Sequence, residues 1–161
     1  MLSALFAKLS TPTVDVVGVA ESELEFARSL GFSSVFRVEE APRDAYDVVL
    51  ETSGVPVAFA MATDLADSGG RLALVGLPVG ASPGVDQNKI ALKDLSMHGI
   101  LHGLNHYREV ATLYGSGAVD PSLLIAGVVK PEAAADALGA TADGASRTRP
   151  KYLIEFAGET G

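Results

Sequence analysis

The fold is decided by residues 46–78, which read YDVVLETSGVPVAFAMATDLADSGGRLALVGLP. Residues 47–51 and 71–75 are short apolar runs typical of buried strands. The Ala-rich residues 56–66 between them predict a helix with Pro56 in its first turn, where proline is tolerated because those N–H groups have no helical partner. A strand, a helix and a second strand in this order predict a parallel βαβ unit.

The same alternation continues in both directions along the chain. We expect further strands at residues 14–19, 35–38, 90–92, 96–101, 124–129 and 152–156. We expect further helices before Thr11 and at residues 22–30, 106–116 and 131–140, with Gly31 ending the second of these. The pattern predicts an α/β fold in which helices flank a mainly parallel sheet. We expect a single domain over residues 1–161, with the sheet in residues 1–104 and a C-terminal helix and strand segment in residues 105–161.

Composition and net charge exclude several classes of binding partner and site. Twelve Lys and Arg against twenty Asp and Glu give a formal net charge of −8. This charge repels phosphate backbones and anionic lipids, so we expect neither nucleic acid nor a membrane as a partner. The sequence has no cysteine, which excludes disulfides and Cys-ligated zinc. Because no apolar run reaches membrane-spanning length and residues 1–10 lack a signal-peptide cleavage site, we expect a soluble, cytoplasmic protein.

Residues 46–54 and 68–78 resemble the cofactor domain of the medium-chain dehydrogenase/reductase family, which includes zinc-type alcohol, polyol and threonine dehydrogenases and quinone reductases. Residues 23–31 (ELEFARSLG) resemble the helix after that family's second strand, and residues 115–121 and 151–156 resemble its C-terminal segment. The resemblance implies a Rossmann-like sheet and an NAD(P)-linked, alcohol dehydrogenase-like oxidoreductase.

One feature of that family is missing from the sequence. No strand–GxGxxG–helix is present, and Gly115-Ser116-Gly117 follows an expected helix and has Asp120 where a third glycine would stand. The resemblance implies a cofactor domain truncated at its N-terminus, without its first central strand, Gly-rich turn and catalytic domain. Since the glycines let the backbone approach the pyrophosphate, we expect weak or lost dinucleotide binding.

The missing strand would leave two inner sheet edges without a partner. Three solutions remain open at this point. Strand 14–19 moves beside strand 47–51, a second chain supplies a strand, or the sequence belongs to a longer product.

Candidate cofactor-binding residues follow the expected strands, because ligands bind at the carboxyl ends of parallel strands. These residues are Gly18, Val19, Thr52, Ser53, Gly54, Val75, Gly76 and Leu77. Ordinary turn chemistry is the alternative explanation for the glycines and serine. The resemblance places Gly18 where NAD-preferring relatives carry an Asp, which favours NADP slightly over NAD, although Val19-Ala20-Glu21 adds no Arg or Lys.

The three histidines cluster at residues 98, 102 and 106. By resemblance, Ile100, Leu101 and His102 lie near the nicotinamide ring, and His102 is our candidate acid–base group because its ordinary pKa suits proton transfer. The alternative is a polar residue at a strand end. We expect no metal site. Lys151, near Arg147 and Arg149, matches a basic residue that relatives use on the pyrophosphate, and a solvated loop is its alternative.

Two functions remain open from the sequence. The first is an NAD(P)-linked oxidoreductase or the larger part of one. The second is a non-redox small-molecule-binding or interaction protein, or a repurposed enzyme, on a degenerate Rossmann fold. In either case we expect a small-molecule ligand. We also expect a homodimer through residues 90–101, as in relatives, or a partner chain that completes the sheet.

Overall fold

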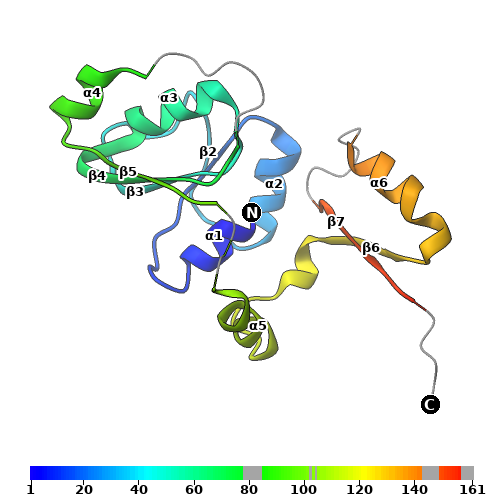
Figure 1. Ribbon diagram of the computed structural model, residues 1–161. Coiled ribbons are helices and arrows are strands. Elements are labelled where there is room, and N and C mark those ends of the chain that lie inside the picture. Colours follow the sequence, from blue (N-terminus) through cyan, green and yellow to red (C-terminus); the bar gives the residue numbers. More distant parts are fainter. Residues whose placement is uncertain (78–84, 102, 104, 143–148, 157–161) are drawn as a thin grey trace. The chain divides into compact units, whose positions relative to one another are not determined.

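The computed structural model describes residues 1–77, 85–101, 103, 105–142 and 149–156. Helices and strands alternate along most of the chain (Figure 1). The strands are β1 (Val16–Gly18), β2 (Val35–Arg37), β3 (Tyr46–Glu51), β4 (Ala66–Leu74), β5 (Ser96–Gly99), β6 (Ile125–Val129) and β7 (Lys151–Ile154). The α-helices are α1 (Leu2–Ala7), α2 (Glu21–Ser29), α3 (Pro56–Leu65), α4 (Gln87–Leu92), α5 (Tyr107–Gly115) and α6 (Ala134–Ala142).

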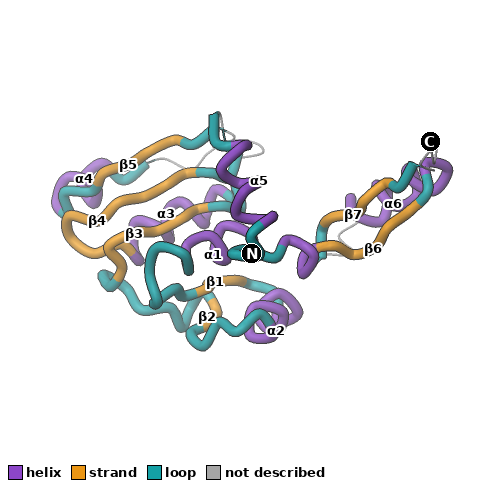
Figure 2. Tube along the Cα trace, turned by 90° about the horizontal axis from the view of Figure 1, so that it is seen from below, coloured by secondary structure: helices purple, strands orange, loops and turns teal. Residues whose placement is uncertain are grey.

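All strand pairs among the described residues are parallel. β1 pairs with β2, β3 with β4, β4 with β5, and β6 with β7 (Figure 2). Parallel strands joined through helices confirm the expected α/β class. The chain divides into two compact units, residues 39–110 and residues 1–38 with 111–161. The expected single domain, with its sheet part in residues 1–104 and its C-terminal part in residues 105–161, stays a prediction.

In the 39–110 unit, α3 packs on one face of the β3–β4–β5 sheet. Its core consists of Ala62, Ala66 and Leu72, with Val49 and Met97 packed against them. Val49, Leu72 and Met97 are register partners across the three strands, so they lie in one row under the helix. The parallel pairing places the carboxyl ends of β3, β4 and β5 at the same edge of the sheet.

In the other unit, α2 connects β1 to β2 and buries Leu24 and Ala27. Gly31 follows the helix at φ +78°, and the Phe32 N–H donates to the Ala27 carbonyl at 3.3 Å. This C-terminal motif confirms Gly31 as the end of the helix. Val16, Ala27 and Phe32 form the local core of this unit, and Val35 packs against it. The core thus holds α2 against β1 and β2.

The described strands form three separate sheets, in which β1 has only β2 and β3 has only β4 as a hydrogen-bonded neighbour. Strands 14–19 and 47–51 belong to different compact units, so the idea that one moves beside the other stays a prediction. A parallel strand normally has a partner on both sides in the middle of such a sheet, so all three solutions stay open.

Two segments differ from expectation. Residues 90–92 are not a strand but the end of α4, because the Asp86 carboxylate accepts a hydrogen bond from the Lys89 N–H at 3.2 Å and caps this helix. The second strand of the βαβ unit begins at Ala66 rather than at Arg71, directly after α3. Its register against β3 shifts between Tyr46 and Val48, and this irregularity takes up the additional residues.

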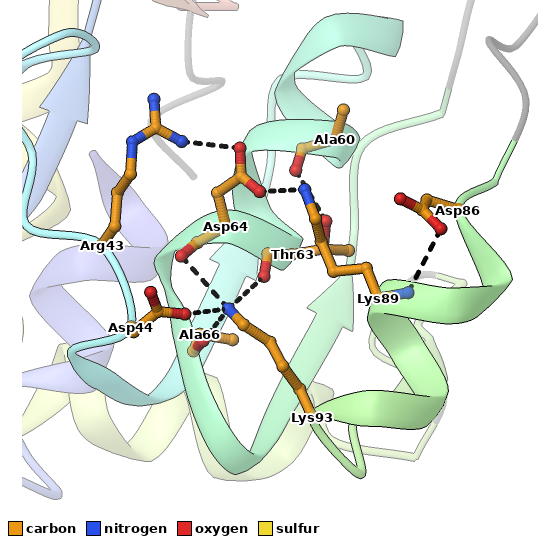
Figure 3. A network of polar contacts seen from close by, with 9 residues as sticks. All are labelled: Arg43, Asp44, Ala60, Thr63, Asp64, Ala66, Asp86, Lys89 and Lys93. Atoms are coloured by element: carbon orange, nitrogen blue, oxygen red, sulfur yellow. Dashed lines mark hydrogen bonds and ion pairs between the residues drawn. The ribbon is translucent and has the colours of Figure 1, made fainter.

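An ionic network (Figure 3) joins α3, α4 and the loop before β3. The Asp64 carboxylate accepts a hydrogen bond from Arg43 Nη1 at 2.6 Å and another from Lys89 Nζ. Burial raises the pKa of Asp64, but the hydrogen bonds and charges of Lys89 and Arg43 outweigh this effect and hold the pKa below its ordinary value. Lys93 pairs with Asp44 at 2.5 Å, beside the same network.

Asp64→Asn is expected to lower the free energy of unfolding at pH 7 by about 1–2 kcal/mol, because two cations lose their shared carboxylate. The folded-state pKa is depressed, so the contribution is present above the ordinary value of 3.8 and is lost as pH falls through the lower folded value. Urea unfolding at pH 7 and at pH 3 tests this, and the difference between variant and wild type should shrink at the lower pH.

The matched control is Glu155→Gln, which removes an exposed carboxylate paired with Lys130 at 2.7 Å. We expect a change below about 0.5 kcal/mol, as for other exposed ion pairs. Equal effects of the two variants would show that the Asp64 network contributes no more than an ordinary surface pair.

Candidate functional site

The loops that follow β3 and β4 are joined through Glu51, the last residue of β3. Its backbone carbonyl accepts hydrogen bonds from Val75 N–H at 2.8 Å and Gly76 N–H at 3.0 Å. Its carboxylate accepts from Ser53 N–H at 2.8 Å, Ser53 Oγ at 2.5 Å and Gly54 N–H at 3.1 Å. The residue is only 8% exposed. One residue therefore fixes its own turn and the turn of the neighbouring strand.

Two glycines allow these turns to touch. A Cβ at Gly76 would lie 2.1 Å from Gly54 N, and a Cβ at Gly54 would lie 2.3 Å from the Leu77 carbonyl oxygen. Gly54 also has φ +68°, a conformation that side chains disfavour. Any larger residue at either position would push the two turns apart. The outcome is a narrow, backbone-lined rim at the carboxyl ends of two parallel strands.

The structure brings together six of the predicted cofactor-binding residues. Thr52, Ser53 and Gly54 follow β3, while Val75, Gly76 and Leu77 follow β4, and the contacts of Glu51 and the glycines join the two groups. Ile100 and Leu101 follow β5 at the same edge, and the Ile100 N–H donates to the Leu74 carbonyl at 2.9 Å. Both are exposed. His102, the candidate acid–base group, lies outside the described residues.

Gly18 and Val19 belong to the other unit. Gly18 ends β1 and is the register partner of Arg37, the last residue of β2. Val19 is exposed and follows directly. Lys151 is the first residue of β7 and pairs with Ile125, so it lies at the amino end of its strand. Arg149 lies 6.0 Å from the Phe26 ring, whereas Arg147 is outside the described residues.

Sequence reasoning missed Glu51 at these strand ends. The apolar pattern marks Glu51 only as the end of a buried strand, although a carboxylate directly before Thr-Ser-Gly is a signal for a turn that it caps.

The described residues contain no group of three His, Asp or Glu that could hold a metal ion. Catalytic and structural zinc sites need such donors or cysteine, and the sequence has no cysteine. The described side chains therefore do not fit a zinc site, and the predicted absence of zinc stays a prediction. In the described part of the chain, no helix is both long and apolar enough to span a lipid bilayer.

Parallel strands joined by helices, with turns of Gly and Ser at their carboxyl ends, are typical of the Rossmann-type nucleotide-binding class. A family model described as zinc-binding dehydrogenase matches residues 1–116, so the chain belongs to that family. The prediction of an NAD(P)-linked oxidoreductase family of the medium-chain, alcohol dehydrogenase-like type is confirmed.

Individual relatives agree. L-threonine 3-dehydrogenase of Pseudoalteromonas atlantica is 34% identical over 110 residues, which are 62% of this chain and 32% of that protein. The structure of benzyl alcohol dehydrogenase from Acinetobacter calcoaceticus matches with a TM-score of 0.80 at 23% sequence identity, and the match covers 96% of this chain and 46% of that dehydrogenase chain. The structure of an NADP-bound zinc-binding dehydrogenase from Sinorhizobium meliloti, described as putative, matches with a TM-score of 0.75 at 23% sequence identity. This match covers 83% of this chain and 43% of the Sinorhizobium meliloti chain. The chain thus spans about a third of the curated relatives it matches and under half of these solved structures.

Proposed function

We propose that this chain binds a nicotinamide dinucleotide weakly and acts as the cofactor-binding part of an alcohol dehydrogenase-like oxidoreductase, with NADP preferred over NAD. The observation that carries the proposal is the glycine-lined rim made by residues 51–54 and 75–77. The backbones of its two turns approach each other so closely that only glycine fits at positions 54 and 76. Such close backbone rims at the carboxyl ends of parallel strands are where this class of fold holds its ligands.

The chemistry of each group follows from its position. Because Glu51 takes up the N–H groups of residues 53, 54, 75 and 76, it is the main-chain carbonyls of the rim that suit the hydroxyls of a ribose and the amide N–H groups of a nicotinamide, as acceptors. Ile100 and Leu101, exposed after β5, suit one apolar face of the nicotinamide ring. A bound dinucleotide would supply hydride transfer. His102 remains the proposed acid–base group, and Lys151 the proposed basic contact to the pyrophosphate.

Weak binding is expected because the sequence contains no strand–GxGxxG–helix. That turn normally directs helix N–H groups at the pyrophosphate, which is the strongest anion contact of the class. The same absence favours the second candidate, a non-redox protein that uses the rim for another small molecule. Both candidates share the rim and differ only in whether a dinucleotide binds.

Calorimetric titration of the full chain with NADPH and NADH distinguishes them. Binding of either dinucleotide tighter than roughly 100 μM, about −5.5 kcal/mol, is the expected result. ATP serves as the control for unspecific attraction of a polyanion and should bind at least about tenfold more weakly. No heat of binding at millimolar NADPH and NADH would overturn the redox proposal in favour of the second candidate.

Two further parts of the proposal concern the binding partners of the chain and its location in the cell. A homodimer through residues 90–101 is supported by exposed apolar side chains in that segment, namely Leu92, Ile100 and Leu101. A chain that supplies a strand beside β1 or β3 is the other proposed partner. The proposed ligand is a small molecule rather than nucleic acid or a membrane, and the proposed location is the cytoplasm.

A further inference from the structure

The two turns of the rim use up their own hydrogen-bond donors. Oxygen atoms of Glu51 and Ser53 accept hydrogen bonds from five rim N–H groups, which belong to residues 53, 54, 55, 75 and 76. The Ser53 hydroxyl in turn donates to the Glu51 carboxylate at 2.5 Å. What these residues can offer a ligand is therefore mainly hydrogen-bond acceptors.

Glu51 also places a negative charge at the base of the rim, between the two turns. The Gly54 N–H approaches both carboxylate oxygens, Oε1 at 3.1 Å and Oε2 at 3.4 Å, and a Cβ at Gly76 would lie 2.7 Å from Oε2. A ligand in contact with the backbone of these glycines therefore lies about 4–7 Å from the carboxylate. Because Glu51 is only 8% exposed, little water screens its charge from such a ligand.

The positive groups that can be placed relative to the rim offset only part of this charge. Neither turn contains a Lys or Arg. Four cations of this unit lie toward the amino ends of the strands, namely Arg43, Arg71, Lys89 and Lys93. Helix α3 begins directly after the first turn, and its N-terminus carries roughly half a positive elementary charge. One full carboxylate charge exceeds this half charge, so the rim keeps a negative potential.

We propose that the rim selects the redox state of the nucleotide: it binds an oxidised nicotinamide dinucleotide, whose ring is a cation, more tightly than the reduced form, whose ring is neutral. Glu51 is the residue that sets this preference. The oxidised ring also presents electron-poor C–H groups, which make better contacts to main-chain carbonyls. The inference rests on the proposed dinucleotide binding and adds which redox state the site retains. It requires only residues 51–77, which belong to one compact unit.

Calorimetric titration of the full chain with NADP⁺ and with NADPH at 0.15 M salt, about the physiological ionic strength, measures the preference. The wild type is expected to bind NADP⁺ about five- to tenfold more tightly, which lies between the attraction of one charge pair in water and in a partly buried site. Glu51→Gln keeps the size of the side chain and removes its charge, so it should reduce the preference to about twofold or less. A purely structural role of Glu51 would weaken both nucleotides equally and leave their ratio unchanged.

Surface substitutions separate the charge at the rim from the net charge of the chain. Asp47→Asn removes an exposed carboxylate from the same strand, about 13 Å before Glu51 and beyond the Debye length at this salt, and should leave the ratio unchanged. Val55, which is 50% exposed, directly follows Gly54. Val55→Lys adds an ammonium at the rim without altering Glu51 and should reduce the preference at least about twofold, whereas the neutral Val55→Gln should keep it. Circular dichroism melting of each variant shows whether the fold is retained.

Each result decides the inference. Equal affinity of the wild type for the two dinucleotides, or tighter binding of NADPH, overturns it and leaves the proposed function intact. An unchanged ratio in folded Glu51→Gln overturns the assignment to Glu51, and so does a loss of preference in Asp47→Asn. If Glu51→Gln does not fold, equal ratios in Val55→Lys and Val55→Gln overturn the role of charge at the rim. If neither dinucleotide binds, the proposed function fails, and the inference fails with it.

Discussion

Replacing Gly76 with alanine is expected to lower the free energy of unfolding by about 3 kcal/mol. The new Cβ would lie 2.1 Å from Gly54 N and 2.7 Å from both Gly54 Cα and Glu51 Oε2. Backbone atoms cannot rotate away as a flexible side chain does, and Glu51 holds both turns by hydrogen bonds. The turns must separate, which breaks the contacts of a nearly buried carboxylate. Urea unfolding followed by circular dichroism measures the loss.

Gly99→Ala is the matched control, because Gly99 ends the neighbouring strand β5 and a Cβ there meets nothing within 4 Å. We expect a change within about 0.5 kcal/mol. The rim is also the proposed ligand site, so Gly76→Ala should weaken NADPH binding while Gly99→Ala should not. A Gly76→Ala chain with the wild-type urea midpoint would show that the two turns are not held together as described.

Lys93→Met is expected to lower the free energy of unfolding by about 2–4 kcal/mol. Lys93 Nζ donates to the carbonyls of Thr63 at 2.8 Å, Asp64 at 3.3 Å and Ala66 at 2.6 Å, and its side chain is only 17% exposed (Figure 3). These carbonyls lie at the C-terminal end of α3, where the helix dipole favours a cation. Methionine fills similar space but leaves the carbonyls without this donor and removes the partner of Asp44.

Lys130→Met is the control for this variant. It removes an exposed ammonium paired with a single carboxylate, Glu155, and should change the free energy of unfolding by less than about 1 kcal/mol. The measurement is the urea midpoint at pH 7 for both variants beside the wild type. A Lys93→Met midpoint equal to that of Lys130→Met would mean that water replaces the ammonium without loss, and the role of Lys93 as a helix cap would be wrong.

The local elements could be predicted because their signals lie within a few residues. Pro56 marks the first turn of α3, Gly31 ends α2, and the apolar runs around Val49 and Leu72 became paired strands. Residues 90–92 misled because a short apolar run has no period that separates strand from helix. The deciding signal was Asp86, a capping side chain placed before that run.

The candidate site was only partly predictable, because some of its contacts join residues that are far apart in the sequence. Thr52 to Gly54 and Val75 to Leu77 follow strands, so their position at one sheet edge follows from parallel topology. Glu51 could not be recognised as the residue that joins them, because its partners Val75 and Gly76 lie beyond an intervening helix. Nothing local indicates which carbonyl will receive those N–H groups.

By itself, the sequence determined the class of this protein: alternating strands and helices, glycine and serine at strand ends, and no cysteine for a thiolate site. The hydrophobic period and the turn residues are properties of one helix or strand and its ends, so a single sequence is sufficient to predict these elements. Only the tertiary structure decided which strand ends are neighbours, because pairing depends on contacts between distant residues that bury a shared core. That pairing placed the turn of Gly76 against the turn of Gly54, and this contact carries the proposed binding site.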